Sequence, residues 1–354
     1  MPFSSRVRFP VVAAICSLLL VACPGSQSTL HASEGKAVPE KRRKLTPAPS
    51  PAPASNPVML GLFQPGVPWD LTQLSQFETA SGRKAAIVHW FQDWANDPAL
   101  HLDLIRKVAD HGSIPMITWE PWNWSQGVNQ PRYSLARIIA GDFDSHARSW
   151  ATGLAAYGGP VLLRWAHEMN GDWTPWGNGV NGNLPGQYVQ AWRHLRAIFR
   201  AAGASNVRWV WSPNVAYDAG TAFESFFPGD ADTEWVALDG YNWGFTDAVH
   251  GGTWQSFGEI FADSYRRITS ISTRPAMIAE TGSADGPGDK AAWIRDALGS
   301  NLPILYPRVR AIVWFNEHKE RNWTIGSSAA SLEAFTEAAR SSMYAFSISD
   351  FPNL

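Results

Sequence analysis

Two glutamates in this sequence each follow an apolar, strand-like run and precede a turn that contains glycine. Glu168 comes at the end of PVLLRWAHE, and Glu280 comes at the end of PAMIAE. Trp173 and Trp176 follow Glu168 within the segment DWTPWG. A carboxyl group among apolar rings has its charged form disfavoured, which raises its pKa toward that of a working general acid. We therefore predict that Glu168 acts as a general acid.

Hydrolysis of a glycosidic bond uses a second carboxyl group, and Glu280 supplies one. When two such groups lie about 5 to 5.5 Å apart, one can attack the sugar while the other protonates the leaving oxygen, and the configuration is retained. We predict a separation of this kind. A single glutamate at a strand end would more simply be a solvated residue or an ion-pair partner, so the prediction depends on the pair.

The same sequence disfavours other chemistries. His167 and Glu168 do not belong to an H-E-x-x-H motif and their segment is strand-like, so we expect no metal. Residues 177–182, GNGVNG, match G-x-G-x-x-G but do not open a helix after a strand, so we expect a loop there and no cofactor. A net charge of -2 gives no basic excess with which to bind nucleic acid.

The elements that position these residues are predicted to be strands alternating with helices. Short apolar runs recur along the chain, and their continuous rather than alternating hydrophobicity indicates strands buried on both faces, as in a parallel sheet covered by helices. The eight predicted strands span residues 58–63, 85–91, 114–119, 161–166, 207–212, 235–241, 276–279 and 311–315.

Helical periodicity occurs between most of these runs. It predicts helices over residues 69–79, 98–111, 144–157, 187–202, 257–271, 289–298 and 331–340, and it is weakest in the fifth connection, around 221–227. The pattern predicts an α/β fold, a (β/α)₈ TIM barrel, as a single catalytic domain over residues 58–354. A doubly wound open sheet is the alternative fold.

In a barrel of this kind the active site lies at the C-terminal ends of the strands. The sequence places polar and aromatic residues at those ends, and with 19 Trp in the chain we expect flat rings to stack on flat ligand faces. The residues predicted to bind substrate are Trp119, Glu120, Trp173, Trp176, Asn242, Trp243 and Trp314. Glu120 and Glu317 are predicted to bind sugar hydroxyls or to orient neighbouring groups, not to form the catalytic pair.

The N-terminal part of the chain is predicted to lie outside the fold. Residues 1–22 have the basic start and short apolar run of a signal peptide, and LVAC resembles a bacterial lipoprotein box that ends in Cys23. Residues 23–57 are rich in Pro, Ala and Ser, which is typical of a semi-extended linker. We expect an exported monomer held at the cell envelope, with a lipid on Cys23 as its membrane anchor, or a secreted protein if Cys23 is not modified.

The motifs RWAHEMNGDWTPWG, DGYNWG and MIAETG resemble those of glycoside hydrolase family 26, a (β/α)₈ family of retaining endo-β-glycanases. The resemblance covers roughly residues 60–346. It implies that Glu168 is the acid/base, that Glu280 is the nucleophile, and that His167 positions the neighbouring catalytic groups. It also implies that Tyr241 hydrogen-bonds the nucleophile, and that Trp173 and Trp314 line the subsites beside the cleaved bond.

The substrate that the resemblance implies is a β-linked polysaccharide. Mannanases of the family tend to have a WFWWG-like string after the acid, whereas this chain has WTPWG. This difference favours mixed-linkage β-1,3-1,4-glucan slightly over mannan. The alternatives are an endo-β-1,4-mannanase and a non-catalytic glycan-binding lipoprotein, and the presence of both carboxyl groups argues against the latter.

Overall fold

The computed structural model describes residues 57–216, 222–245, 252–299 and 301–345. The predicted signal peptide, Cys23 and all but the last residue of the predicted linker lie outside these residues. Within the described ranges, no helix has both the length and the apolar character needed to cross a membrane.

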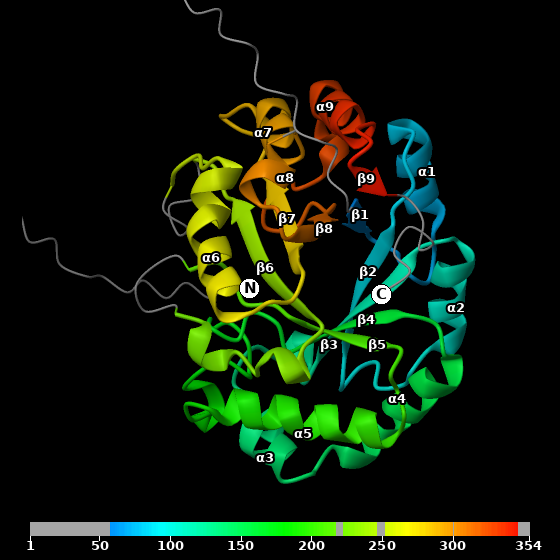
Figure 1. The fold of residues 1–354 in the computed structure, drawn as a ribbon, viewed down its shortest axis with the longest axis vertical. Helices are drawn as coiled ribbons and strands as arrows, with labels where there is room; N and C mark the ends of the chain where they lie inside the picture. Colours follow the sequence, from blue (N-terminus) through cyan, green and yellow to red (C-terminus); the bar gives the residue numbers. More distant parts are fainter. Residues whose placement is uncertain (1–56, 217–221, 246–251, 300, 346–354) are drawn as a thin grey trace, which may run out of the picture. The chain divides into compact units, whose positions relative to one another are not determined.

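Eight parallel strands form a closed barrel (Figure 1). Each strand pairs with the next in sequence, and β1 pairs with both β2 and β8, which closes the ring. The strands are β1 (Val58–Phe63), β2 (Ile87–Asp93), β3 (Ile114–Glu120), β4 (Val161–Trp165), β5 (Val207–Trp211), β6 (Trp235–Asn242), β7 (Ala276–Ser283) and β8 (Val309–Phe315). A two-residue strand, β9 (Tyr344–Ala345), pairs with the start of β1. The prediction of a (β/α)₈ barrel is confirmed.

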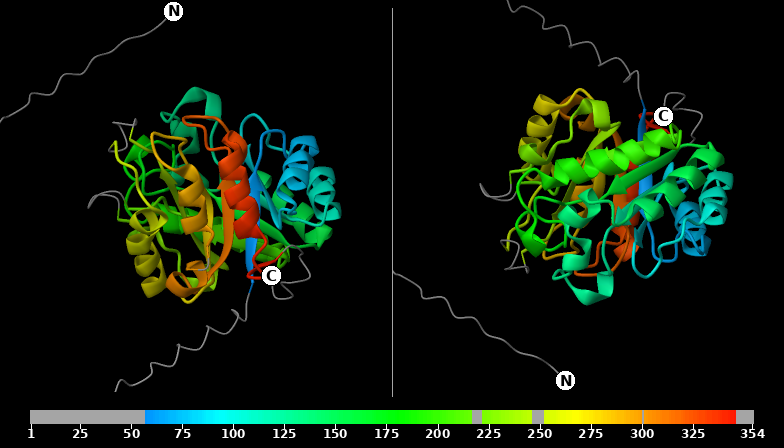
Figure 2. Two further views of the ribbon diagram at one scale, coloured as in Figure 1. Left: turned by 90° about the horizontal axis from the view of Figure 1, so that it is seen from above. Right: turned by 90° about the horizontal axis from the view of Figure 1, so that it is seen from below.

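Helices cover the outside of the strands, as both views in Figure 2 show. The helices are α1 (Thr72–Ser81), α2 (Leu102–Asp110), α3 (Leu135–Ile139), α4 (Asp144–Tyr157), α5 (Gln187–Ala201), α6 (Phe257–Ile271), α7 (Lys290–Ala297), α8 (Leu302–Leu305) and α9 (Ala329–Ala339). All the predicted helices are present, whereas the short α3 and α8 had no prediction. Between β5 and β6 the described residues form only the 3₁₀ turns Glu224–Phe226 and Asp230–Asp232, where helical periodicity was weakest.

Local sequence sets where helices begin and end. Ser256 and Glu259 form a capping box at the start of α6, in which each side chain accepts a hydrogen bond from the other residue's backbone N–H. At the end of α4, Gly158 adopts a left-handed conformation with φ 75°, which a glycine reaches without steric cost. These signals explain why the predicted bounds of α4 and α6 agree with the structure.

Side chains along each strand alternate between the barrel interior and the surrounding helices. One buried cluster fills the interior and includes Met59, Ile87, Met116 and Leu162. The residues between them in sequence belong to a second, larger cluster that packs against the helices, as Leu60 and Val88 do. The alternation decides which residues near the strand ends point into the barrel mouth.

Candidate active site

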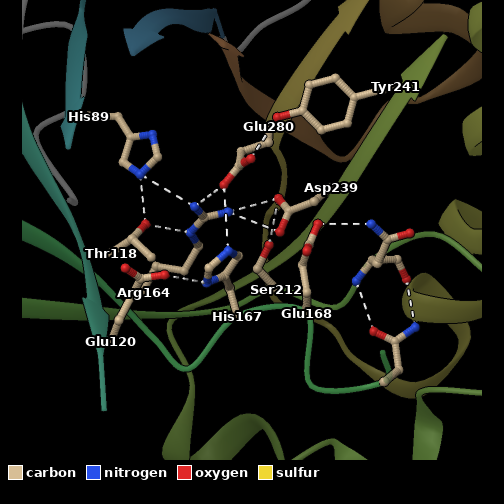
Figure 3. Close-up of polar contacts among 12 residues, drawn as sticks. His89, Thr118, Glu120, Arg164, His167, Glu168, Ser212, Asp239, Tyr241 and Glu280 are labelled. Atoms are coloured by element: carbon tan, nitrogen blue, oxygen red, sulfur yellow. Dashed lines mark hydrogen bonds and ion pairs between the residues drawn. The ribbon is translucent and has the colours of Figure 1, made fainter. Parts of the chain in front are cut away.

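A buried arginine occupies the interior of the barrel near the C-terminal ends of the strands (Figure 3). Arg164 follows the inward-facing Leu162 on β4 by two positions and has no exposed surface. Its Nη1 donates to both carboxylate oxygens of Asp239 at 2.9 Å, and its Nε donates to Thr118 Oγ1 at 2.8 Å. Its Nη2 donates to Glu280 Oε1. Burial opposes the charge of Arg164, but Asp239 and Glu280 raise the pKa of the guanidinium above its ordinary value, so it stays charged.

Glu280 reaches the interior because β7 contains a bulge. The prediction ended this strand at Ala279, whereas β7 runs on to Ser283 and its register with both neighbours shifts just before Glu280. Met277 and Ala279 belong to the interior cluster, so regular alternation would turn Glu280 toward the helices. The extra residue keeps Glu280 inside, next to Arg164. β-bulges commonly re-aim side chains beside active sites.

Tyr241 holds the second oxygen of Glu280. The Tyr241 hydroxyl donates to Glu280 Oε2 at 2.6 Å, while Arg164 contacts Oε1. Burial and the nearby carboxylates, Glu280 first among them, raise the pKa of Tyr241 well above its usual value, so the phenol keeps its proton and donates. The two donors fix the position of the carboxyl group. The contact between Tyr241 and Glu280 is the one that the family resemblance implied.

Glu168 lies just after β4 on a backbone of unusual conformation. Ala166 and Glu168 have φ of 46° and 53°, in the left-handed region that non-glycine residues seldom adopt. The Glu168 backbone N–H donates to the carbonyl of Ser212 at 2.7 Å, which ties this turn to the end of β5. Strain of this kind persists only where the surroundings hold it, and it collects at functional sites.

Two donors from neighbouring loops orient the Glu168 carboxyl group. Asn214 Nδ2 donates to Oε1 at 2.8 Å, and Trp173 Nε1 donates to Oε2 at 2.6 Å. Burial, and then the charge of Glu280, raise the pKa of Glu168 above its ordinary value, although both hydrogen bonds lower it. Glu168 and Glu280 are therefore close enough to influence each other's charge. A carboxyl group that holds its proton to higher pH is suited to general acid catalysis.

A Trp173→Phe variant should move the alkaline limb of the kcat/KM profile to higher pH. The change keeps an aromatic ring but removes the N–H that lowers the pKa of Glu168. Because an acid catalyst is active only while protonated, a higher pKa extends activity upward in pH. Rates measured from pH 5 to 9 check this, and a limb that is unmoved or moves downward would contradict the assignment of Glu168 as the acid.

His167 lies between two carboxyl groups. Its Nδ1 is 3.9 Å from Glu120 Oε1, and its Nε2 is 3.9 Å from Glu280 Oε1. Burial, and then the charge of Arg164, hold the pKa of His167 well below its usual value, so the ring is neutral. Burial raises the pKa of Glu120 to about 8. Glu120 is thus a mainly protonated neighbour of His167 at neutral pH, on the inward face of β3 but with little exposed surface.

Two of the tryptophans predicted to bind substrate do not face the barrel mouth. Trp119 has no exposed surface and stacks on Trp150 of α4, with ring centroids 4.9 Å apart. Trp314 is 1% exposed, packs against Trp293 of α7, and donates from Nε1 to the carbonyl of Trp323. Both occupy outward positions on their strands, so they belong to the layer between strands and helices. The prediction that they bind substrate is wrong.

Trp176 and Asn242 also need correction as substrate-binding residues, because both side chains are fully buried. Trp176 Nε1 donates to the carbonyl of His167 at 2.6 Å. This bond holds the backbone directly before Glu168. Asn242 Nδ2 donates to Ser283 Oγ at 2.9 Å, and its Oδ1 accepts from the backbone of Gln255. Both side chains hold neighbouring segments of the site in place through these hydrogen bonds.

Of the residues predicted to contact substrate, the two tryptophans that keep exposed surface are Trp173 and Trp243. Trp173 is 37% exposed beside Glu168, and Trp243 is partly buried in a cluster with Tyr241, Phe315 and Trp323. These positions agree with the predicted substrate contacts of Trp173 and Trp243, which stay predictions.

Sequence reasoning missed Arg164 and Asp239, two charged residues of the site. Arg164 and Asp239 each interrupt a run of apolar residues within a predicted buried strand, and a charge in such a place needs a partner. The presence of two opposite charges within buried strands could have predicted an ion pair between Arg164 and Asp239. In the part of the chain that the structure describes, no group of three or more His, Cys, Asp or Glu side chains is arranged to hold a metal ion.

A closed barrel of eight parallel strands, with one carboxyl group just after β4 and an interacting one on β7, both at the C-terminal ends of the strands, is the architecture of the (β/α)₈ glycoside hydrolases. The chain belongs to glycosyl hydrolase family 26, whose family model matches residues 84–323.

Among curated proteins, the chain is 40% identical over 268 residues to Endoglucanase H of Acetivibrio thermocellus, covering 75% of this chain and 28% of that protein. It is 38% identical over 171 residues to the mannan endo-1,4-beta-mannosidase A and B of Caldalkalibacillus mannanilyticus, covering 46% of this chain and 29% of that protein. The chain thus spans less than a third of the length of both relatives.

Solved structures share the fold. A modular endo-β-1,4-mannanase from Cellulomonas fimi superimposes with a TM-score of 0.61 at 19% identity, covering 82% of this chain and 72% of that chain. A GH26 β-mannanase from Bacteroides ovatus superimposes with a TM-score of 0.60 at 18% identity, covering 83% and 91%.

Proposed function

We propose that the chain is a retaining endo-β-glycanase in which Glu280 is the nucleophile and Glu168 is the acid/base. One observation carries the proposal: the two carboxyl groups lie in different environments within one site. Glu280 is held by a cation and a phenol, whereas Glu168 has a pKa raised by burial and by Glu280. Two carboxyl groups that are held by different partners in one site are suited to separate roles.

In the first step, a Glu280 oxygen attacks the anomeric carbon and the glycosidic C–O bond breaks. Glu168 gives its proton to the departing oxygen, which leaves as a hydroxyl. In the second step, Glu168 takes a proton from water, the water oxygen bonds to the anomeric carbon, and the bond to Glu280 breaks. Two inversions at one carbon restore the β configuration. The aromatic surface at the mouth would hold the sugar chain in place for both steps.

The polymer that we favour is mixed-linkage β-1,3-1,4-glucan. The support is that a protein named as an endoglucanase is 40% identical over 75% of this chain, while a relative named for mannan matches only 46% of it. The WTPWG string after the acid supports the same choice. Mannan is the second candidate, since several curated relatives are named for it.

Purified protein should release reducing sugar from barley β-glucan faster than from galactomannan, β-1,3-xylan or cellulose at equal mass concentration. Products of intermediate length early in the digest would indicate endo action. The anomeric form of the fresh product, read by proton NMR before mutarotation, should be β. Binding to these polymers without release of reducing sugar would favour a non-catalytic glycan-binding protein, and α product would contradict the retaining mechanism.

The proposal includes export to the cell envelope. A lipid on Cys23, followed by the Pro-rich segment to residue 57, would present the barrel to polysaccharide outside the membrane.

A further inference from the structure

A hollow of about 750 Å³ lies on the outer surface of the barrel, along α1 and beside α2. Figures 1 and 2 show these two helices side by side on one flank. The lining comes from the loop before α1, from α1 itself and from Lys107 on α2, and it includes none of the catalytic-site residues described above. The hollow is shallow and wide open to solvent.

Trp69 provides a flat apolar face at the edge of this hollow. The side chain is 52% exposed, and among the described residues its indole has no aromatic neighbour and no hydrogen-bond partner. Its backbone is nevertheless fixed, because Lys107 Nζ donates to the Trp69 carbonyl at 2.8 Å. The next residue, Asp70, accepts from the backbone N–H of Thr72 at 2.9 Å, which anchors the loop to α1. The ring is therefore exposed on a supported backbone.

The polar groups around Trp69 favour an uncharged ligand rich in hydroxyl groups. Thr72, Gln76 and Ser75 line the hollow with hydroxyl and amide groups, which can both donate and accept hydrogen bonds. The two charges in the lining are of opposite sign, Asp70 and Lys107, so the hollow attracts neither polyanions nor polycations. A pyranose offers the same combination, an apolar face with hydroxyl groups around its edge.

We propose that this hollow is a second binding surface for a neutral β-glycan, separate from the catalytic mouth, with Trp69 as its stacking platform. The inference rests on the proposed function for the identity of the polymer. A long chain held at Trp69 stays near the barrel after each cut, which raises the effective concentration of polymer at the mouth. Short oligosaccharides that occupy only the mouth gain nothing from the hollow.

The test compares Trp69→Ala with the unaltered chain in two measurements. Affinity electrophoresis in native gels containing barley β-glucan or galactomannan is run in a Glu280→Gln background, so that the polymer is not cut. The Trp69→Ala change should weaken retardation, with an apparent Kd for the preferred polymer raised about threefold to tenfold. In the catalytically intact chain, kcat/KM should fall on the polymer and stay unchanged on a tetrasaccharide.

Two further variants separate stacking from a general surface effect. Trp69→Tyr keeps a flat ring and should recover most of the retardation. Ile304→Ala removes an apolar side chain that is 58% exposed on α8 and should leave retardation unchanged. Equal retardation of Trp69→Ala and the parent chain would overturn the inference while leaving the proposed hydrolysis intact. Failure of the intact chain to cut any β-glycan would instead remove the proposed function.

Discussion

A Glu280→Ala variant should lose turnover on every β-glycan by on the order of 10⁴-fold or more, because it lacks the carboxylate that we propose forms the covalent bond to the anomeric carbon. The fold should persist, since Arg164 keeps its bonds to Asp239 and Thr118. Oligosaccharide binding should persist as well, because the aromatic residues at the mouth are unchanged. Initial rates, circular dichroism and titration calorimetry measure the three quantities.

Azide distinguishes a nucleophile from any other essential residue. In Glu280→Ala, the cavity admits azide on the face where the carboxylate stood, so an activated β-glycoside should give the α-glycosyl azide. In Glu168→Ala, the covalent intermediate still forms and azide should give the β product. Glu333→Ala, an exposed glutamate on α9, serves as the control and should keep parental rates. Substantial turnover of Glu280→Ala without azide would remove the assignment.

An Arg164→Met variant should be less stable by about 3 to 5 kcal/mol, which is about 10 °C in Tm for a domain of this size. The change leaves Asp239 and Glu280 facing each other in the barrel without their shared cation. Burial raises the pKa of Asp239 and the charge of Arg164 opposes that rise, so the pKa should climb further in the variant. Activity should fall too, because Glu280 loses the donor to Oε1.

The stability loss of Arg164→Met should depend on pH in a defined direction. A carboxyl group whose pKa is raised by folding contributes no penalty below its unfolded pKa and an increasing one as pH rises. The difference in Tm between variant and parent should thus be largest near pH 7 and shrink toward pH 4. Arg148→Met is the control, because its ion pair with Asp144 lies on the surface and is worth less than about 1 kcal/mol. A loss that is small or independent of pH would contradict this account.

The barrel could be predicted from sequence because its signals are local. Continuous apolar runs marked all eight strands, and helical periodicity marked α4 and α6, whose ends carry the capping residues seen in the structure. The two glutamates that we propose as catalytic were chosen by the same reasoning, since each comes after a recognisable strand. The short helices α3 and α8 were missed because four or five residues show too little periodicity to detect.

The substrate-binding residues were predicted less well because the prediction did not apply alternation along each strand. Thr118 and Glu120 point inward, so Trp119 between them points outward. The same rule places Trp314 outward beside the inward Phe315. Because these strands are buried on both faces, their hydrophobicity shows no two-residue period, but side-chain direction alternates in every strand and would have excluded both tryptophans once one inward residue was known.

The orientation of Glu280 is a different case. Strict alternation from Met277 and Ala279 would have sent it outward, and only the register shift in β7 brings it inside. Bulges depend on pairing between strands, which a single segment of sequence does not specify. The choice of Glu280 as a site residue came from its position after an apolar run and from family motifs, not from the geometry that turns it inward.

The sharing of Arg164 between two carboxylates bears on the reactivity of the attacking oxygen. A guanidinium devoted wholly to Glu280 would withdraw electron density from the atom that must form the new bond. Asp239 already takes both bonds from Nη1, so Glu280 meets a cation whose charge is largely balanced. In the proposed mechanism Glu280 becomes an ester and loses its negative charge, while Asp239 stays as the counter-ion of Arg164. The ion pair between Arg164 and Asp239 can therefore stay in place both in the resting enzyme and in the proposed covalent intermediate.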